Sequence, residues 1–182
     1  MRIAVIGKGN IGGTLGAAFE RAGHEVAYGS RRGGIAEALS AAEAVALALP
    51  DGGVDDFLTK HGAGLSGPLV VDATNRVGAP VANAAAAIRA AGPDARYVRA
   101  FNTLGWENFA DPDFGDGPAD LFYSAAEADR PAAEELIGAV GLRPVWVGAD
   151  KENLVDGLLP LWFALTQARD GNRRLAFRLL EK

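Results

Sequence analysis

Cysteine is absent from this sequence of 182 residues, and histidine is scarce, with two copies. A chain without cysteine forms no disulfide, has no thiolate nucleophile and offers no thiolate metal site. Two histidines are too few for a histidine-rich metal centre. We therefore expect no bound metal and no catalysis by a cysteine nucleophile.

Excess positive charge and long apolar runs are missing as well. The 18 lysines and arginines are outnumbered by 23 acidic residues, for a net charge of −5, so the basic surface typical of nucleic-acid binding is not expected. The first apolar run covers only residues 3–6 and ends in glycines, whereas a secretory signal needs about 7–15 apolar residues. We expect a cytoplasmic protein that binds neither nucleic acid nor membrane.

The apolar residues that are present, 49% of the chain, alternate between strand-like and helix-like patterns. Short continuous apolar runs are typical of strands in a parallel sheet that is covered on both faces. They lie at residues 3–6, 25–28, 44–49, 69–71, 97–101, 121–124 and 144–147, and helical patterns lie at 11–22, 35–42, 54–61, 81–91 and 131–140. This order predicts an α/β protein with a doubly wound, mainly parallel sheet.

The length predicts a single domain, residues 1–182, in which residues 151–182 form a C-terminal helical tail. The most apolar helix is expected at residues 154–168. Pro160 within it should either kink the helix or mark its first turn. The apolar side chains of Trp162 and Phe163 should be buried, against a second subunit or beneath the ligand pocket.

A glycine-rich turn directly follows the first predicted strand. It reads Gly7-Lys8-Gly9-Asn10-Ile11-Gly12, which has the G-x-G-x-x-G spacing of dinucleotide-binding turns. Gly7 permits the tight turn, Gly9 lets the backbone approach a pyrophosphate, and Gly12 lets the helix pack closely on the strand. The N–H groups of Asn10 and Ile11 would then face the phosphates. Plain strand-to-helix turns can share this spacing, but the setting between a strand and a helix favours a Rossmann-type dinucleotide site.

The end of the second strand selects between NAD and NADP. NAD sites place an acidic residue there, which accepts a hydrogen bond from the ribose 2′-hydroxyl. This chain instead has Ser30, Arg31 and Arg32, beginning 18 residues after Gly12. Two guanidinium groups and a hydroxyl suit a 2′-phosphate, which an acid would repel. The sequence predicts NADP; the alternative is a pair of solvated surface arginines.

Polar residues and a proline follow the next strands, where open α/β sheets place their ligands. We expect Leu49 and Pro50 to shape the loop beside the nicotinamide ribose, although a proline can also simply end a strand. Thr74, Asn75, Asn102 and Thr103 are candidates for hydrogen bonds to the nicotinamide carboxamide or ribose, although such residues also commonly cap loops. Trp106 and Phe101 are more typical of core packing than of a pocket lid.

Several segments together resemble the family of coenzyme F420-dependent NADP oxidoreductases, whose fold also forms the reductase domain of STEAP-type metalloreductases. The order of the motifs at the strand ends, Pro50, Thr74-Asn75 and Asn102-Thr103, is more specific than the glycine turn. The matching stretches are residues 7–12, 23–26, 29–32, 47–50, 70–75, 99–103, 141–144, 154–160 and 175–180.

This resemblance implies an NADPH-dependent oxidoreductase that passes hydride directly between the nicotinamide and a second ring system, a deazaflavin (F420) or a flavin (FMN or FAD). No acid–base catalyst is then needed, and we expect none. Homodimers are also expected from the family. Two other functions stay open: reduction of a small imine or carbonyl, and a non-catalytic NADP(H)-binding redox sensor. The segment at residues 33–43 is shorter than in relatives and borders the adenosine end of the site.

Overall fold

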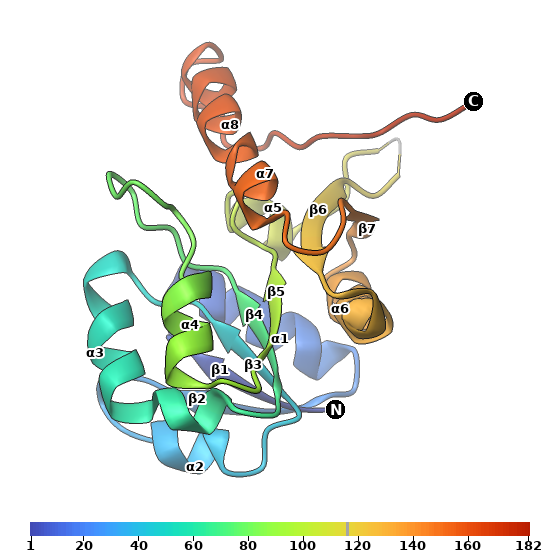
Figure 1. The fold of residues 1–182 in the computed structure, drawn as a ribbon. Helices are drawn as coiled ribbons and strands as arrows, with labels where there is room; N and C mark the ends of the chain where they lie inside the picture. The colour runs from blue at the N-terminus through green and yellow to red at the C-terminus, as the bar shows by residue number, and fades with distance from the viewer. Residues whose placement is uncertain (116) are drawn as a thin grey trace.

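The computed structural model describes residues 1–115 and 117–182, and Figure 1 shows their arrangement. Within these residues seven strands form one sheet. The strands are β1 (Arg2–Ile6), β2 (Glu25–Gly29), β3 (Ala44–Leu47), β4 (Leu69–Asp72), β5 (Arg96–Arg99), β6 (Asp120–Ala125) and β7 (Arg143–Trp146). The α-helices are α1 (Asn10–Arg21), α2 (Ile35–Leu39), α3 (Asp51–His61), α4 (Ala85–Ala91), α5 (Glu107–Ala110), α6 (Arg130–Ala139), α7 (Glu152–Asp156) and α8 (Leu158–Gln167). Two short 3-10 helices cover Gly62–Leu65 and Glu127–Asp129.

The strand order in the sheet is β2-β1-β3-β4-β5-β6-β7, and all neighbours are parallel except β5 and β6. The chain leaves β1 for β2 on one side and then returns to place β3 on the other side of β1. Such a reversal is a topological switch point, which leaves a crevice at the carboxyl ends of the two strands. The glycine-rich turn after β1 and the loop after β3 therefore meet at this crevice.

Helices cover both faces of the sheet, so each strand contributes side chains to two cores. Along β1, Ile3 and Val5 belong to the core beneath α1 and α6, while Ala4 and Ile6 belong to the core beneath α2, α3 and α4. Figure 1 shows these two groups of helices on opposite sides of the sheet. The predicted doubly wound, mainly parallel α/β architecture is confirmed.

Several predicted segment boundaries need correction, and the helix expected at 35–42 already ends at Leu39. The third strand ends at Leu47 and not at residue 49, and the helix expected from residue 54 already begins at Asp51. The helix expected at 81–91 begins only at Ala85, because the side chains of Asp72 and Asn83 bind the N–H groups of Ala84 and Ala85. The strand expected at 97–101 ends at Arg99, and Phe101 then turns the chain with a φ of 61°.

The C-terminal region consists of two helices rather than the single helix expected at 154–168. The break lies at Gly157, and Pro160 lies in the first turn of α8, where its missing N–H is not needed. Trp162 is buried in the core of its own chain, whereas Phe163 is exposed. In the described part of the chain, no helix is both long and apolar enough to cross a membrane.

The segment between β2 and β3 contains only the short helix α2, and β2 is the edge of the sheet. Among the described residues, no further strand lies beyond β2. The turn at the end of β2 stays uncovered on its outer side. This turn, α2 and α3 surround one end of the crevice.

Candidate functional site

The turn between β1 and α1 fits closely against the loop that follows β3. Gly7 has a φ of 110°, and a Cβ there would lie 2.3 Å from the carbonyl oxygen of Ala48. A Cβ on Gly12 would lie 1.8 Å from the carbonyl oxygen of Gly7. Only glycine fits at these two positions. At Gly9 the space is open, because a Cβ would meet nothing within 4 Å, so a ligand can approach this backbone closely.

Helix α1 presents its N-terminus to the same space. Gly9 is the N-cap residue, and no described side chain caps the helix. The first N–H groups of an α-helix have no intrahelical acceptor, and Gly9, Asn10 and Ile11 all line the adjoining cavity. Uncapped N–H donors at a helix N-terminus form an anion-binding site.

This cavity has a volume of about 800 Å³ and a strongly one-sided charge. Four cationic side chains line it, and its described lining contains no carboxylate. The lining residues are Gly7, Lys8, Gly9, Asn10, Ile11, Ser30, Arg31, Arg32, Ala48, Leu49, Pro50, Ala73, Asn75, Trp106 and Arg173. A protein with a net charge of −5 thus concentrates positive charge here, which favours a ligand that carries several negative charges.

The cavity continues toward α2 and α3 in a second hollow of about 820 Å³. The two share four lining residues, Ser30, Arg31, Leu49 and Pro50. The second hollow is more apolar, with Ile35 and Phe57 in its walls. Together they form one crevice, whose part beyond the end of β2 is also lined by Glu37, Asp56, Lys60 and His61.

The turn after β2 holds its two arginines outward. Ser30 and Gly33 exchange backbone hydrogen bonds of 3.1 and 2.9 Å, and the Ser30 hydroxyl accepts a bond from the N–H of Arg32 at 3.2 Å. Arg31 and Arg32 are exposed, and neither forms an ion pair with any carboxylate of the described residues. Both guanidinium groups are therefore available to an external anion.

The opposite end of the cavity is formed by Ala73, Asn75, Trp106 and Arg173. The Nε of Arg173 donates a hydrogen bond to Oε1 of Glu107 at 2.7 Å, and the guanidinium lies 5.0 Å from the centroid of the Trp162 ring. The C-terminal tail thus contributes a cation to the site. Sequence reasoning missed Arg173, because only the fold brings the tail beside the strand ends.

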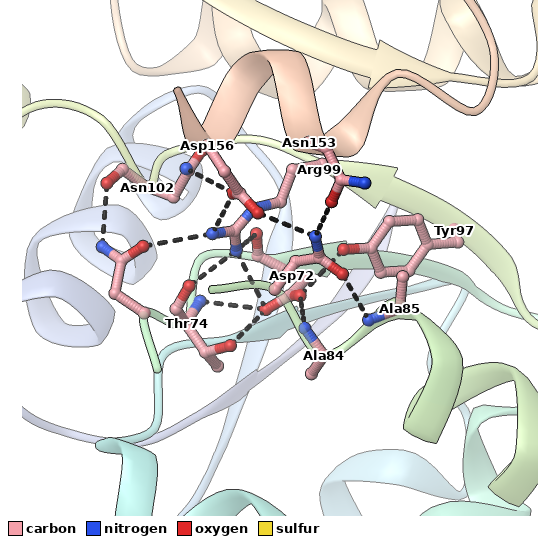
Figure 2. A network of polar contacts seen from close by, with 11 residues as sticks. Asp72, Thr74, Ala84, Ala85, Tyr97, Arg99, Asn102, Asn153 and Asp156 are labelled. Carbon is pink, nitrogen blue, oxygen red and sulfur yellow. Dashed lines mark hydrogen bonds and ion pairs between the residues drawn. The ribbon is translucent and has the colours of Figure 1, made fainter. Parts of the chain in front are cut away.

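Beneath this end lies a buried polar network, shown in Figure 2. Its first member is Asp72, the last residue of β4, which is fully buried. Its carboxylate accepts four hydrogen bonds, from the N–H and hydroxyl of Thr74, the N–H of Ala84 and the hydroxyl of Tyr97. Four bonds fill the acceptor positions of a carboxylate. The Asp72 side chain therefore fixes both the start of the loop after β4, at Thr74, and the start of α4, at Ala84.

Burial raises the pKa of Tyr97 well above its usual value, and the neighbouring Asp72 carboxylate raises it further. Arg99 acts in the opposite direction. The Tyr97 hydroxyl therefore remains a hydrogen-bond donor to Asp72, at 2.8 Å, over the whole physiological range.

The second member is Arg99, the last residue of β5, whose side chain has no exposed surface. Nε donates to Asp156 at 2.7 Å, Nη1 donates to the carbonyl oxygens of Asp72 and Thr74 at 3.0 and 2.6 Å, and Nη2 donates to Oδ1 of Asn75 at 3.1 Å. Nη2 also lies 2.6 Å from Oδ1 of Asp156. The guanidinium thus donates four hydrogen bonds and forms an ion pair with Asp156.

The loop after β5 contributes the third part of the network. Its residue Phe101 is buried with a left-handed backbone, which is uncommon for a bulky residue and marks local strain. The turn directs the carbonyl oxygen of Asn102 to the Nδ2 of Asn75, at 2.8 Å. Nδ2 of Asn102 donates to Asp156 at 3.2 Å, and its buried Oδ1 has no partner among the described residues.

The residues predicted for the site thus divide into two groups. Ten of them surround one cavity: Gly7, Gly9, Asn10, Ile11, Ser30, Arg31, Arg32, Leu49, Pro50 and Asn75. Thr74, Asn102 and Thr103 are buried and do not line the described cavity, and Gly12 lies behind the turn. Of the two aromatic residues considered, Trp106 lines the cavity, while Phe101 packs in the core against Phe109.

Asp72, Arg99 and Asp156 were not predicted as functional residues. Asp72 and Arg99 could have been identified from the sequence, because each is a charged residue directly after or within a predicted apolar strand. Nothing in the local pattern around residue 156 indicates that its carboxylate meets Arg99, 57 residues away.

Comparisons with known proteins agree with this geometry at the level of the fold. No protein-family model matches the chain, and no curated protein matches it. Among solved structures, a protein from Arthrobacter sp. described as a candidate F420-dependent NADP reductase is 22% identical, with complete coverage of both chains and a TM-score of 0.82. A hypothetical protein from Sinorhizobium meliloti is 29% identical over 82% of this chain and 85% of its own, with a TM-score of 0.69.

A reductive aminase from Aspergillus terreus, solved with NADPH and ethyl levulinate, is 18% identical with a TM-score of 0.67. The match covers 93% of this chain but only 62% of that enzyme. The chain therefore has a Rossmann-like α/β fold, and it shares that fold over its whole length with the protein from Arthrobacter, as the resemblance in its sequence implied.

Proposed function

We propose that the protein is an oxidoreductase that binds NADP(H) in the crevice at the carboxyl ends of β1 and β3. The observation that carries the proposal is the 800 Å³ cavity, which is lined by four cations and by the uncapped N-terminus of α1, with no carboxylate in its described lining. A dinucleotide with a pyrophosphate and an additional phosphate has the size and charge for this space. The fold shared with a candidate NADP reductase and with an NADPH-bound aminase supports the same ligand.

The preference for NADP over NAD rests on the turn after β2. The exposed guanidinium groups of Arg31 and Arg32 and the hydroxyl of Ser30 would hold the 2′-phosphate, because these cations have no acidic partner among the described residues. The pyrophosphate would lie against Gly9, Asn10 and Ile11. The apolar hollow beside Leu49, Pro50 and Phe57 would take the adenine.

When bound, NADPH supplies a hydride from its nicotinamide ring. The described lining of the cavity contains no Asp, Glu or His, so the chain offers no evident acid–base group there. Its contribution is to orient two reactants and to exclude water. This supports an acceptor that needs no proton from the protein during transfer, namely a deazaflavin (F420) or a flavin (FMN or FAD). The flat ring of Trp106 and the cation of Arg173 suit a planar, anionic acceptor at that end.

Binding and turnover are tested separately. NADPH and NADH titrations of the purified protein should give a lower Kd for NADPH. NADPH oxidation would then be followed with F420, FMN, FAD, a cyclic imine, a ketone with an amine, and no acceptor. Turnover with a deazaflavin or flavin supports the proposal, and turnover only with the imine or the ketone supports the aminase-like alternative. Tight NADPH binding without turnover on any acceptor would leave a redox sensor.

We also propose that the protein is a homodimer through its C-terminal helices. Leu154, Leu161 and Phe163 expose 64%, 48% and 41% of their surface, although α8 is the most apolar helix. Figure 1 shows α8 projecting beyond the sheet. A second copy that packs against α7 and α8 would bury these side chains. Light scattering after size exclusion should give the mass of a dimer, and Leu161→Glu should give the mass of a monomer; a monomeric wild-type protein would refute the proposal.

A further inference from the structure

Arg99 lies beneath the cavity and not in it, yet its guanidinium donates three hydrogen bonds to the loop after β4, which forms one end of the cavity, and one to Asp156 of α7 (Figure 2). We propose that Arg99, together with Asp156, is a positioning residue for the nicotinamide half of the bound dinucleotide. The inference rests on the proposed binding of NADP(H), and it adds residues that touch neither cofactor nor acceptor.

The first step concerns the loop after β4. Nη1 of Arg99 holds the carbonyl oxygens of Asp72 and Thr74, and Nη2 holds Oδ1 of Asn75. Ala73 and Asn75 line the cavity directly. The side chain of Asn75 is therefore not free to adapt to a ligand, since its Nδ2 also donates to the carbonyl oxygen of Asn102. One guanidinium thus sets the shape of this wall before any ligand binds.

The second step concerns the C-terminal helices. Asp156, at the end of α7, accepts a hydrogen bond from Nε of Arg99 at 2.7 Å and from Nδ2 of Asn83 at 2.7 Å, and its Oδ1 lies 2.6 Å from Nη2 of Arg99. The same side chain therefore connects the loop after β4 to the helices that precede Arg173, the cation at that end of the cavity. Displacement of α7 would change the shape of both walls.

The third step concerns residue type. Arginine offers five N–H groups in a planar fork, whereas lysine offers three on a flexible stem. The acceptors around Arg99 are an Asp156 oxygen on one side and two carbonyls and an amide oxygen on the other. Lysine keeps the charge but leaves acceptors without donors, so it should not replace arginine here.

These contacts predict an effect confined to one half of the ligand. The network lies beneath Ala73 and Asn75, at the end of the cavity opposite Ser30, Arg31 and Arg32. Loss of the network should weaken binding of NADPH, which reaches both ends. It should leave adenosine 2′,5′-bisphosphate, which carries only the adenosine half with its 2′-phosphate, bound as in the wild type.

The experiment measures the Kd of both ligands by calorimetry for the wild type, Arg99→Lys, Asp156→Asn and a matched control, Arg96→Lys. Arg96 lies on the same strand and pairs with Asp129 at 2.7 Å, away from the cavity. In Arg99→Lys and Asp156→Asn the Kd of NADPH should rise roughly tenfold, the equivalent of one charge-assisted hydrogen bond. The Kd of the bisphosphate should stay within about twofold of the wild-type value, and the control should match the wild type for both ligands.

Other outcomes are equally decisive. Equal weakening of both ligands in Arg99→Lys and Asp156→Asn would show a merely structural role and overturn the inference, as would wild-type NADPH affinity in both variants. If Arg99→Lys does not fold, Asp156→Asn alone decides, because its altered side chain keeps its size. A wild-type protein that binds neither ligand would instead refute the proposed function itself.

Discussion

The two ends of the crevice use arginine in opposite ways. At the end of β2, Arg31 and Arg32 are exposed and have no carboxylate partner in the described structure. At the ends of β4 and β5, Arg99 has no exposed surface, and its guanidinium donates four hydrogen bonds within the chain and pairs with Asp156. The arginines of the first end keep their positive charge for a ligand, whereas Arg99 beneath the second end uses its charge to hold the protein together.

This difference means that the exposed arginines affect ligand affinity, whereas the buried arginine affects the position of the backbone around the site. Cations without partners add electrostatic attraction for an anion and cost the fold little when they are removed. A buried guanidinium with two carboxylates adds no net attraction for an anion, but it determines where the surrounding backbone lies. We expect substitutions at the two ends to have separable effects on stability and on ligand affinity.

The largest difference should appear in the stability of two methionine variants. Arg99→Met leaves Asp72 and Asp156 without their buried partner, which typically costs about 3–5 kcal/mol. Arg31→Met removes an exposed side chain without an ion pair, so its free energy of unfolding should stay within about 0.5 kcal/mol of the wild-type value. Urea denaturation of the three proteins measures both. Equal stability of the two variants would mean that the buried network does not contribute to the free energy of unfolding.

A pair of alanine variants addresses the turn between the two ends. In Gly12→Ala the new Cβ would lie 1.8 Å from the carbonyl oxygen of Gly7, whereas at Gly13 a Cβ meets nothing within 4 Å. Gly12→Ala should lose about 3 kcal/mol of stability and most of its NADPH affinity, because the turn must shift. Gly13→Ala should gain up to about 1 kcal/mol, since alanine favours a helix over glycine. Thermal denaturation and NADPH titration of both variants provide the check, and a harmless Gly12→Ala would contradict it.

Charge reversal at the exposed end should affect affinity alone. In Arg31→Asp the NADPH Kd should rise about 10- to 100-fold, as expected for the loss of a charge-assisted bond to phosphate. The Kd of NADH should change far less, because NADH has no 2′-phosphate. The difference should shrink as salt increases, since exposed charges are screened. Titrations at low and high salt test this, and unchanged NADPH affinity would show that the arginine pair is ordinary surface.

Sequence reasoning recovered the fold because its signals are local. Short apolar runs, a glycine turn and helical periodicity identified all seven strands and most of the helices. Sequence reasoning failed where a side chain distant in the sequence determines where a helix or strand begins or ends. The late start of α4 depends on Asp72, and the turn at Phe101 depends on the contacts of the loop that follows β5.

The candidate site was also predictable only where its signals are local in the sequence. The phosphate turn, Ser30, Arg31 and Arg32 follow known spacings, and the structure brings them to one cavity. Thr74 and Asn102 were expected to bind the cofactor through their side chains; in the structure the Thr74 hydroxyl donates to Asp72 and Nδ2 of Asn102 donates to Asp156, while Oδ1 of Asn102 has no partner among the described residues. Their residue type is the same for both roles, and only the tertiary contacts distinguish them.

The smallest effect concerns Tyr97, whose contribution to stability at the buried end depends on pH. Its pKa is raised in the folded protein, by burial first and by Asp72 second. A raised pKa means that the folded state keeps its proton longer than the unfolded chain. The associated stability is therefore complete below the unfolded pKa of about 10 and is lost as the pH rises above that value.

Tyr97→Phe removes one of the four hydrogen bonds to Asp72 and should cost about 1 kcal/mol at pH 8. Between pH 8 and pH 10.5 the variant should lose less stability than the wild type, because the group that titrates is gone. Tyr28 and Tyr123 also have raised pKa values, so a smaller loss should persist. Urea denaturation at the two pH values measures the difference. If both proteins lose the same stability, the Tyr97 hydroxyl is not coupled to the Asp72 network, and the contrast between the two ends would rest on Arg99 alone.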